Sequence, residues 1–389
     1  MKKEELLQNM VPEGPEWRIP WREIEHSSLS PLICRMKQTM QNPAWHGEGD
    51  VWTHTRMVCE CLTSLEAYRL LERRKQEEVF LAALLHDIGK IPCTRQEEGI
   101  WTSPGHTAAG ARMARELLWL DWGLCGTEEK QIFRETICAL IRHHSVPLHI
   151  LDQPSPERRV LQIAAEGELA SDFSVELLCL LARADVTGRQ TSSAADSLEL
   201  IELCAAQAEE AGCLKGPFPF PTAYGAYRYL SGGRMAPGQP LYDDTWGQVI
   251  LMSGLPGTGK DTWIRENGQD RPVISLDQLR REMGVSHTEA QGPVISRARE
   301  MARGYLRRKI PFIWNATCLA PVIREKQVGL FTDYHASVRI VFLETGWEEE
   351  LRRNRERTEQ VPEPVIRRML GNMTLPRRFE AHEVAWLCV

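Results

Sequence analysis

The chain has 389 residues, of which 42% are hydrophobic and 26% charged, and its net charge is −6. This length suffices for two or three domains that each bury a core. No stretch approaches 18 uninterrupted apolar residues, and the basic N-terminus lacks the apolar run of a signal peptide, so we expect a cytoplasmic protein without a membrane partner. The eleven scattered cysteines fit reduced thiols in that compartment.

Residues from about 51 to 211 have a helical pattern almost throughout. Apolar positions recur at intervals of three and four, and helix starts are indicated at Ser103, Thr127 and Ser174. We therefore expect an all-α domain over residues 1–215.

A stretch rich in Pro, Gly and Tyr follows over residues 216–245 and is typical of a linker that packs on its neighbours. From residue 246 to 389, short apolar runs alternate with helical stretches. The expected strands are 249–253, 273–275, 312–314, 338–343 and 384–387. This order predicts an α/β domain, with helices on both faces of a parallel sheet.

An ordered series of histidines and aspartates marks the helical domain: His54, His86, Asp87, His106, His143 and Asp185. Any single one of them could be a satisfied core residue, but the whole set favours metal binding, because imidazole and carboxylate suit divalent cations and two ions can share one carboxylate. His144 lies on a different helix face from His143, and which of the two is a ligand stays open.

This series resembles the HD phosphohydrolase superfamily, an all-helical fold, over roughly residues 50 to 190. The resemblance implies two transition metals such as Mn²⁺, Fe²⁺, Ni²⁺ or Co²⁺. It assigns His54, His86, Asp87 and Asp185 to one ion, and Asp87, His106 and His143 to the second. A water activated by both ions would attack phosphorus, and Lys90 would steady the phosphate.

The stretch VILMSGLPGTGKDTW, residues 249–263, predicts a buried strand, a glycine-rich loop and the start of a helix. This order suits a loop whose backbone N–H groups surround a phosphate at a helix N-terminus. We expect NTP, chiefly ATP, with Mg²⁺ at Gly254, Leu255, Pro256, Gly257, Thr258, Gly259, Lys260, Asp261 and Thr262. Lys260 would reach the outer phosphates. Asp261 replaces the usual Ser or Thr, so Thr262, or Asp261 through water, must hold the magnesium.

Two further groups suit phosphoryl transfer. Asp277 and Arg280 follow the second strand on one helical face, as a proton acceptor and a phosphate ligand would. Arg353 and Arg357 are four residues apart in a helix expected to run up to Pro362, so they would project together from a lid.

Residues 247–389 resemble the kinase domain of bacteriophage polynucleotide 5′-kinase in the phosphate loop, the Asp-x-x-Arg motif and the Arg-Asn-x-x-Arg element. The resemblance implies that Asp277 is the general base, that Arg280 holds the 3′ phosphate of the acceptor, that Lys260 contacts the β and γ phosphates, and that Arg353 and Arg357 are lid arginines. The whole layout is similar to the bacterial HD phosphohydrolase with polynucleotide kinase family.

Our hypothesis is a bifunctional enzyme that phosphorylates 5′-OH ends of RNA or DNA and hydrolyses 3′ or 2′,3′-cyclic phosphate ends ahead of a ligase. Two alternatives remain open. One is a nucleoside or sugar kinase fused to an HD nucleotidase, and the other is a nucleotide-sensing regulator. The sequence indicates neither the oligomeric state nor the preferred nucleic acid.

Overall fold

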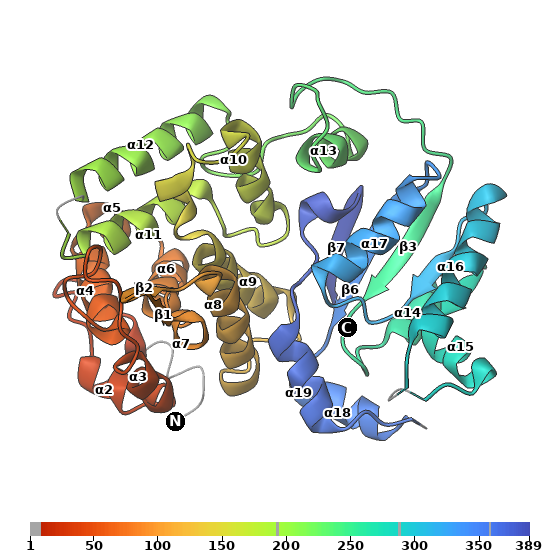
Figure 1. Ribbon diagram of the computed structural model, residues 1–389, viewed down its shortest axis with the longest axis horizontal. Helices are drawn as coiled ribbons and strands as arrows, with labels where there is room; N and C mark the ends of the chain where they lie inside the picture. Colours follow the sequence, from red (N-terminus) through yellow and green to blue (C-terminus); the bar gives the residue numbers. More distant parts are fainter. Residues whose placement is uncertain (1–8, 192–193, 287–288, 358) are drawn as a thin grey trace. The chain divides into compact units, whose positions relative to one another are not determined.

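The computed structural model describes residues 9–191, 194–286, 289–357 and 359–389 (Figure 1). The chain divides into two compact units. The first, the helical unit, comprises the described residues up to 124 together with 129–218, and the second, the α/β unit, comprises 125–128 and 219–389. The expected fold class, a helical region followed by an α/β domain with a parallel sheet, is confirmed.

The helical unit is built from many short and medium helices. They are α2 (Trp21–Glu25), α3 (Ser30–Met36), α4 (Val51–Ser64), α5 (Glu66–Arg69), α6 (Arg73–Leu85), α7 (Lys90–Cys93), α8 (His106–Glu116), α9 (Glu128–His143), α10 (Pro156–Ala164), α11 (Val175–Thr187) and α12 (Ala194–Glu210). Short helical turns at Leu117–Asp121, Val146–His149 and Ala165–Glu168 connect them. A small hairpin of β1 (Arg95–Glu97) and β2 (Ile100–Thr102), which the sequence pattern did not indicate, interrupts the helices.

Side-chain caps fix where two of the central helices begin. Asp50 caps α4 by accepting from the backbone N–H groups of Trp52 and Thr53, and Ser174 caps α11 by accepting from Leu177 N–H, as expected from the sequence. Helix α8 begins at His106, three residues after the expected start. Capping therefore sets the positions of His54 and Asp185 along their helices.

Gly89 brings helix α8 against the turn that follows α6. A Cβ at this position would lie 2.0 Å from the carbonyl oxygen of His106 and 2.4 Å from the backbone nitrogen of Gly110. Only glycine permits this approach of two backbones. The contact places the first turn of α8 beside Asp87.

The α/β unit contains a five-stranded, fully parallel sheet. The strands β3 (Gln248–Ser253), β4 (Val273–Ser275), β5 (Ile313–Asn315), β6 (Ser337–Glu344) and β7 (Glu383–Cys388) are arranged in the order β4-β5-β3-β6-β7. The helices are α13 (Ala223–Leu230), α14 (Lys260–Asn267), α15 (Leu276–Met283), α16 (Gly292–Arg307), α17 (Pro321–Thr332), α18 (Trp347–Arg355) and α19 (Glu363–Asn372), with a short turn at Arg378–Glu380 (Figure 1).

The two faces of β3 pack into different cores. Val249 and Leu251 join a core that includes residues of α16 and α17, whereas Ile250 and Met252 join a core with Trp263 and other residues. Such a strand, apolar on both faces, is characteristic of a buried parallel sheet. The strand order reverses at β3, which makes its carboxyl end the place where open α/β sheets bind ligands.

Candidate functional site

In the helical unit, Asp87 lies at the centre of a buried cluster. Its Oδ2 lies 3.2 Å from Nε2 of His86, and its Oδ1 lies 3.6 Å from Nε2 of His106 and 3.9 Å from Nε2 of His144. These side chains come from the end of α6, the start of α8 and the end of α9. Asp87 therefore faces imidazole nitrogens with both of its oxygens.

His54 and Asp185 complete this cluster from α4 and α11. Nε2 of His54 lies 3.0 Å from Oδ1 of Asp185 and 3.7 Å from Oδ2 of Asp87. All of these side chains except that of His106 are at most 3% exposed. We call the six residues the candidate metal centre: His54, His86, Asp87, His106, His144 and Asp185.

His144, and not His143, belongs to this group. The geometry therefore favours His144 in the choice that the sequence left open, instead of the His143 that the family resemblance assigned. Nε2 of His143 lies 3.1 Å from Oε1 of Glu166, away from Asp87. Consecutive helical residues point about 100° apart, so only one of the pair can face the centre. The sequence pattern could not choose between them because both positions are buried.

Backbone carbonyls fix the orientation of three of the imidazoles. In each, Nδ1 donates to the carbonyl oxygen three residues earlier: His86 to Ala83 at 2.8 Å, His106 to Ser103 at 2.9 Å, and His144 to Ile141 at 2.8 Å. A carbonyl oxygen can only accept, so Nδ1 carries a proton, and Nε2, which faces Asp87, is the nitrogen left for a metal.

These residues fit divalent metal ions. Nε2 of His86 and Oδ1 of Asp87 are buried, and neither makes a hydrogen bond within the described ranges. Burial lowers the pKa of His144 to about 3, so its imidazole is neutral at pH 7, which is the metal-binding form. Burial opposes ionisation of Asp87, but His86 and Lys90 hold its pKa well below the usual value.

Two cations pair with the carboxylates of the centre. Nζ of Lys90 lies 2.7 Å from Oδ2 of Asp87 and donates to Oε1 of Gln41 at 2.6 Å. Arg189, one turn after Asp185, forms an ion pair with it, and its Nε lies 3.1 Å from Oδ1. Each cation stands where it could also bind a phosphate oxygen.

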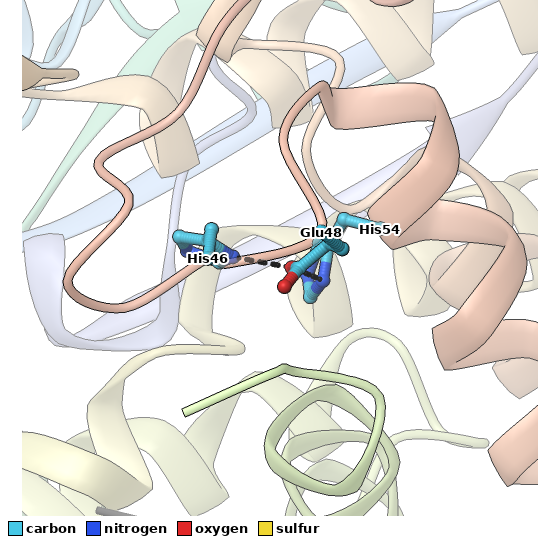
Figure 2. A group of neighbouring side chains, drawn as sticks. All are labelled: His46, Glu48 and His54. Carbon is cyan, nitrogen blue, oxygen red and sulfur yellow. Dashed lines mark hydrogen bonds and ion pairs between the residues drawn. The ribbon is translucent and has the colours of Figure 1, made fainter. Parts of the chain in front are cut away.

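A second carboxylate lies behind His54 (Figure 2). Oε1 of Glu48 accepts from Nδ1 of His46 at 2.9 Å and lies 2.8 Å from Nδ1 of His54, although this second contact lacks the alignment of a hydrogen bond. Nε2 of His46 in turn lies 3.5 Å from Nζ of Lys90. The three side chains of Figure 2 thus link His54 of the candidate metal centre to Lys90, which pairs with Asp87.

In the α/β unit, residues 254–259 form the loop between β3 and α14, and Lys260, Asp261 and Thr262 form the first turn of the helix. Gly254, Gly257 and Gly259 have φ values of +141°, +89° and +84°. A Cβ on Gly257 would also lie 2.8 Å from the carbonyl oxygen of Glu350. Glycine is required here both for the backbone conformation and for the close packing of α18.

Lys260 lies folded against its own loop. Its Nζ donates to the carbonyl oxygens of Gly254 at 2.9 Å and Leu255 at 2.7 Å. Burial lowers the pKa of Lys260 to about 8. Burial also raises the pKa of Glu350 to about 8, against the influence of the Lys260 ammonium.

Asp277 lies in the first turn of α15 and faces a pocket of about 250 Å³. The polar residues lining this pocket include Asp261, Asp277, Gln278, Arg281, Asn315 and Arg357. Arg280 forms an ion pair with Oδ1 of Asp277 and donates to Oε1 of Gln291 at 2.6 Å, and Nη2 of Arg357 lies 3.5 Å from Oδ2 of Asp277. The pocket therefore joins the expected acceptor carboxylate to the helix that follows the phosphate loop.

Asn315 positions Asp261 at this pocket. Its Nδ2 donates to Oδ1 of Asp261 at 2.7 Å from the carboxyl end of β5. In many phosphate-loop enzymes an aspartate near such a strand end holds magnesium, but here an amide orients the carboxylate on α14 instead.

The expected lid helix is shorter than its sequence indicates. Helix α18 ends at Arg355, because the side chain of Asn354 bonds to both backbone groups of Val361 and closes a turn. Arg357 lies in this turn, so the argument from helical spacing to Arg353 was wrong. The two arginines occupy different places: Arg357 is close to Asp277, and Nη1 of Arg353 lies 3.2 Å from the position of a Cβ on Gly259.

Comparisons with known proteins divide the chain in the same way. The family model described as HD domain matches residues 51–185, and the model AAA_33, described as AAA domain, matches residues 249–376. The chain combines an HD domain with a P-loop kinase-like AAA domain. These two domains support enzymatic activity on nucleotide-related substrates.

One named relative matches a smaller part of the chain. A Multifunctional CCA protein of Halorhodospira halophila (strain DSM 244 / SL1) is 39% identical over 136 residues, which cover 29% of this chain and 30% of that protein. The chain thus spans less than a third of the length of this relative. Among the described residues, no helix is long and apolar enough to cross a membrane.

Several residues of both domains escaped the reasoning from sequence. In the helical unit these are Gln41, His46, Glu48 and Arg189, which lie outside the ordered His and Asp series and outside the residues that the HD family model matches. In the AAA domain they are Arg281 and Asn315. The position of Arg189 one turn after Asp185 was a usable signal, whereas nothing in the sequence connected residues 41–48 to the cluster.

Proposed function

We propose that the chain repairs both ends of a nucleic-acid break, as an NTP-dependent 5′-OH polynucleotide kinase and a metal-dependent 3′-end phosphohydrolase. The observation that carries the kinase half is the placement of Asp277 in one pocket with Asp261 and Arg357, beside the helix that begins at Lys260. A carboxylate at that place can take a proton from a hydroxyl that attacks the γ-phosphate.

In the proposed transfer, the 5′ oxygen of the acceptor forms a bond to the γ-phosphorus of the NTP as its proton passes to Asp277. The bond between that phosphorus and the β–γ bridging oxygen breaks, and NDP leaves. Lys260, Arg353 and Arg357 would neutralise the developing charge together with magnesium held near Asp261 and Thr262. Arg280 would exchange its contact with Asp277 for a phosphate of the acceptor.

In the HD domain, we propose that His54, His86, Asp87 and Asp185 hold one metal ion and that Asp87, His106 and His144 hold a second. This proposal is supported by three groups of side chains whose ligand atoms lie within 4.8 Å of one another. Asp87 and His144 each belong to two of these groups. Two such ions supply an activated water and charge neutralisation at a phosphate. Lys90 and Arg189 are placed to bind the phosphate oxygens. One water would convert a 3′ phosphate to a hydroxyl end and inorganic phosphate. A 2′,3′-cyclic phosphate would need two waters, the first to open the ring to a phosphomonoester and the second to release inorganic phosphate.

A small acceptor such as a nucleoside remains the second candidate for the kinase half. It is favoured by the compact pocket of about 250 Å³ and by the net charge of −6, since a polynucleotide site profits from a basic surface. The two candidates differ in their response to salt, because only a polymer contacts several phosphates.

The kinase proposal is tested with NTP labelled in the γ-phosphate and equal concentrations of a 5′-OH oligonucleotide and a nucleoside. We expect label on the oligonucleotide, with a rate that falls as salt increases. Transfer to the nucleoside alone would refute the polynucleotide assignment. An oligonucleotide that already carries a 5′ phosphate serves as the control and should gain no label.

A further inference from the structure

The helical unit contains a carboxylate that belongs to neither of the two metal positions proposed above but lies directly behind one of their ligands. Glu48 precedes α4, its side chain is fully shielded from solvent, and its Oε1 lies 2.8 Å from Nδ1 of His54 (Figure 2). We propose that Glu48 is a positioning residue that fixes the tautomer and orientation of His54 for metal binding. This inference rests on the metal site of the proposed function.

His54 differs from the other imidazoles of the centre in how its second nitrogen is satisfied. His86, His106 and His144 each donate from Nδ1 to a backbone carbonyl three residues earlier. For His54 the oxygen beside Nδ1 is that of Glu48 instead. Each imidazole thus has an oxygen behind it, and that of His54 is the only carboxylate among the four.

The contact decides which nitrogen of His54 keeps its proton when a metal binds. A lone pair on Nδ1 at 2.8 Å from a carboxylate oxygen would be repelled, so Nδ1 is protonated. Nε2 makes a hydrogen bond with Oδ1 of Asp185 at 3.0 Å, so this nitrogen also carries a proton when no ion is bound. A metal ion would replace the proton on Nε2, while Glu48 keeps the proton on Nδ1. A carboxylate partner also makes the imidazole a more basic ligand than a carbonyl does.

Two hydrogen bonds hold Glu48 in this place. Its Oε2 accepts from the backbone N–H of Gln190 at 3.0 Å, and its Oε1 accepts from Nδ1 of His46 at 2.9 Å. Gln190 closely follows the helix that carries Asp185. Glu48 therefore ties the loop before α4 to the segment that follows α11, the two helices that carry His54 and Asp185.

A separate metal site at His46, Glu48 and His54 is the competing explanation, because their donor atoms also lie within 4.8 Å of one another. Two observations oppose it. An ion there would require His54 to lose both ring protons and bridge two cations, and the ammonium of Lys90 lies 3.5 Å from Nε2 of His46. The positioning role needs neither condition.

The test compares metal binding by the full chain and two variants, Glu48→Gln and Glu60→Gln. Glu60 lies on α4, the helix that carries His54, and accepts a hydrogen bond from Trp21. Its replacement therefore removes the same charge at a distance from the centre. A glutamine at position 48 cannot replace both carboxylate oxygens as hydrogen-bond acceptors. If its oxygen faces the histidines, its NH₂ group points at the N–H of Gln190. If its oxygen faces Gln190, its NH₂ group points at the Nδ1 protons of His46 and His54. We measure Mn²⁺ binding by equilibrium dialysis and melting with metal removed.

We expect Glu48→Gln to weaken binding of one Mn²⁺ by about 10- to 100-fold, the usual effect of losing an outer partner of a ligand. Glu60→Gln should bind as the parent chain does. Equal Mn²⁺ affinity in all three proteins would overturn the positioning role. If the parent chain binds three ions and Glu48→Gln binds only two, Glu48 instead belongs to a separate metal site. A parent chain that binds no Mn²⁺ would instead refute the proposed metal site itself.

A second measurement stands even if Glu48→Gln does not fold. In the Zn²⁺-loaded parent chain, ¹⁵N–¹H correlation spectra of the histidine rings should show the proton of His54 on Nδ1. A His54 ring whose Nδ1 carries no proton would contradict the inference.

Discussion

The candidate metal centre and the phosphate loop are assembled in different ways. The phosphate loop is one contiguous stretch of backbone, in which three glycines with positive φ present N–H groups at the start of α14. The metal centre brings together side chains from α4, α8, α11 and the ends of α6 and α9, and Asp185 lies 131 residues from His54. Local conformation therefore determines the first site, and long-range packing with hydrogen bonds behind each ligand determines the second.

This difference predicts that each site can be removed without the other. The largest effect is expected from Asp87→Asn, because Asp87 is shared by both proposed metal positions. Metals contribute several kcal/mol to such reactions, so hydrolysis of a 2′,3′-cyclic phosphate should fall by about 10³-fold or more. Opening of the cyclic phosphate and release of inorganic phosphate together measure hydrolysis, and labelling of the 5′ end, measured in parallel, should be unchanged. A loss of both activities would contradict the independence of the sites.

Asp277→Asn is the reciprocal variant. The amide keeps the shape of the side chain but cannot accept a proton, so the turnover rate for phosphorylation of the oligonucleotide should fall by about 10²- to 10⁴-fold. Titration with a non-hydrolysable NTP should give an unchanged Kd, since the phosphate loop is intact. Full activity in the variant would disprove the assignment of Asp277 as general base.

A matched pair of variants sharpens the description of the metal centre. His144→Gln should weaken Mn²⁺ binding by more than about 10-fold, because loss of a residue that contacts the metal should reduce affinity more than loss of a residue that only supports a ligand. His143→Gln should leave Mn²⁺ binding within about twofold, because that ring pairs with Glu166. Equilibrium dialysis measures the Mn²⁺ affinity of both variants. A larger loss of affinity in His143→Gln than in His144→Gln would identify His143 as the ligand.

The pH dependence of the kinase should report Lys260. The pKa of Lys260 is lowered to about 8. The fraction of molecules in which Lys260 is charged therefore declines above pH 8, and well above this pKa it falls about tenfold for each pH unit. We therefore expect kcat/KM for NTP to decline above pH 8, while hydrolysis by the HD domain need not follow. A profile that is flat up to about pH 9.5, well above that pKa, would be inconsistent with a free enzyme that depends on this charge.

The smallest effect is expected at Arg281, which lines the acceptor pocket. Arg281→Ala should raise KM for an oligonucleotide a few-fold and reduce the slope of log affinity against log salt by about one, as the loss of one phosphate contact does. KM for NTP should stay the same. An unchanged salt slope would place Arg281 outside the path of the nucleic acid.

The same difference explains how far the sequence could predict the structure. All five strands of the α/β unit were anticipated, because each is an apolar run beside turn residues, and the phosphate loop was readable as a contiguous pattern. The lid helix was overextended because its arginines and glutamates favour helix, while the decisive bonds from Asn354 to Val361 depend on the folded turn.

In the metal centre, the ordered series was visible but its surroundings were not. The pair His143 and His144 differ only in helical phase, which depends on where α9 packs. Glu48 and Gln41 lie before α4 and reach the cluster only after folding, through contacts with His54 and Lys90. Spacing in the sequence carries no information about such partners.

The central claim, two independent end-processing sites on one chain, is tested most directly by end-group analysis of a single oligonucleotide that carries a 5′-OH and a 2′,3′-cyclic phosphate. With Mn²⁺, Mg²⁺ and NTP, we expect a product with a 5′ phosphate and hydroxyls at the other end, and omission of NTP should prevent only the 5′ change. An oligonucleotide recovered with both ends unaltered, from a protein that does phosphorylate a nucleoside, would contradict the claim.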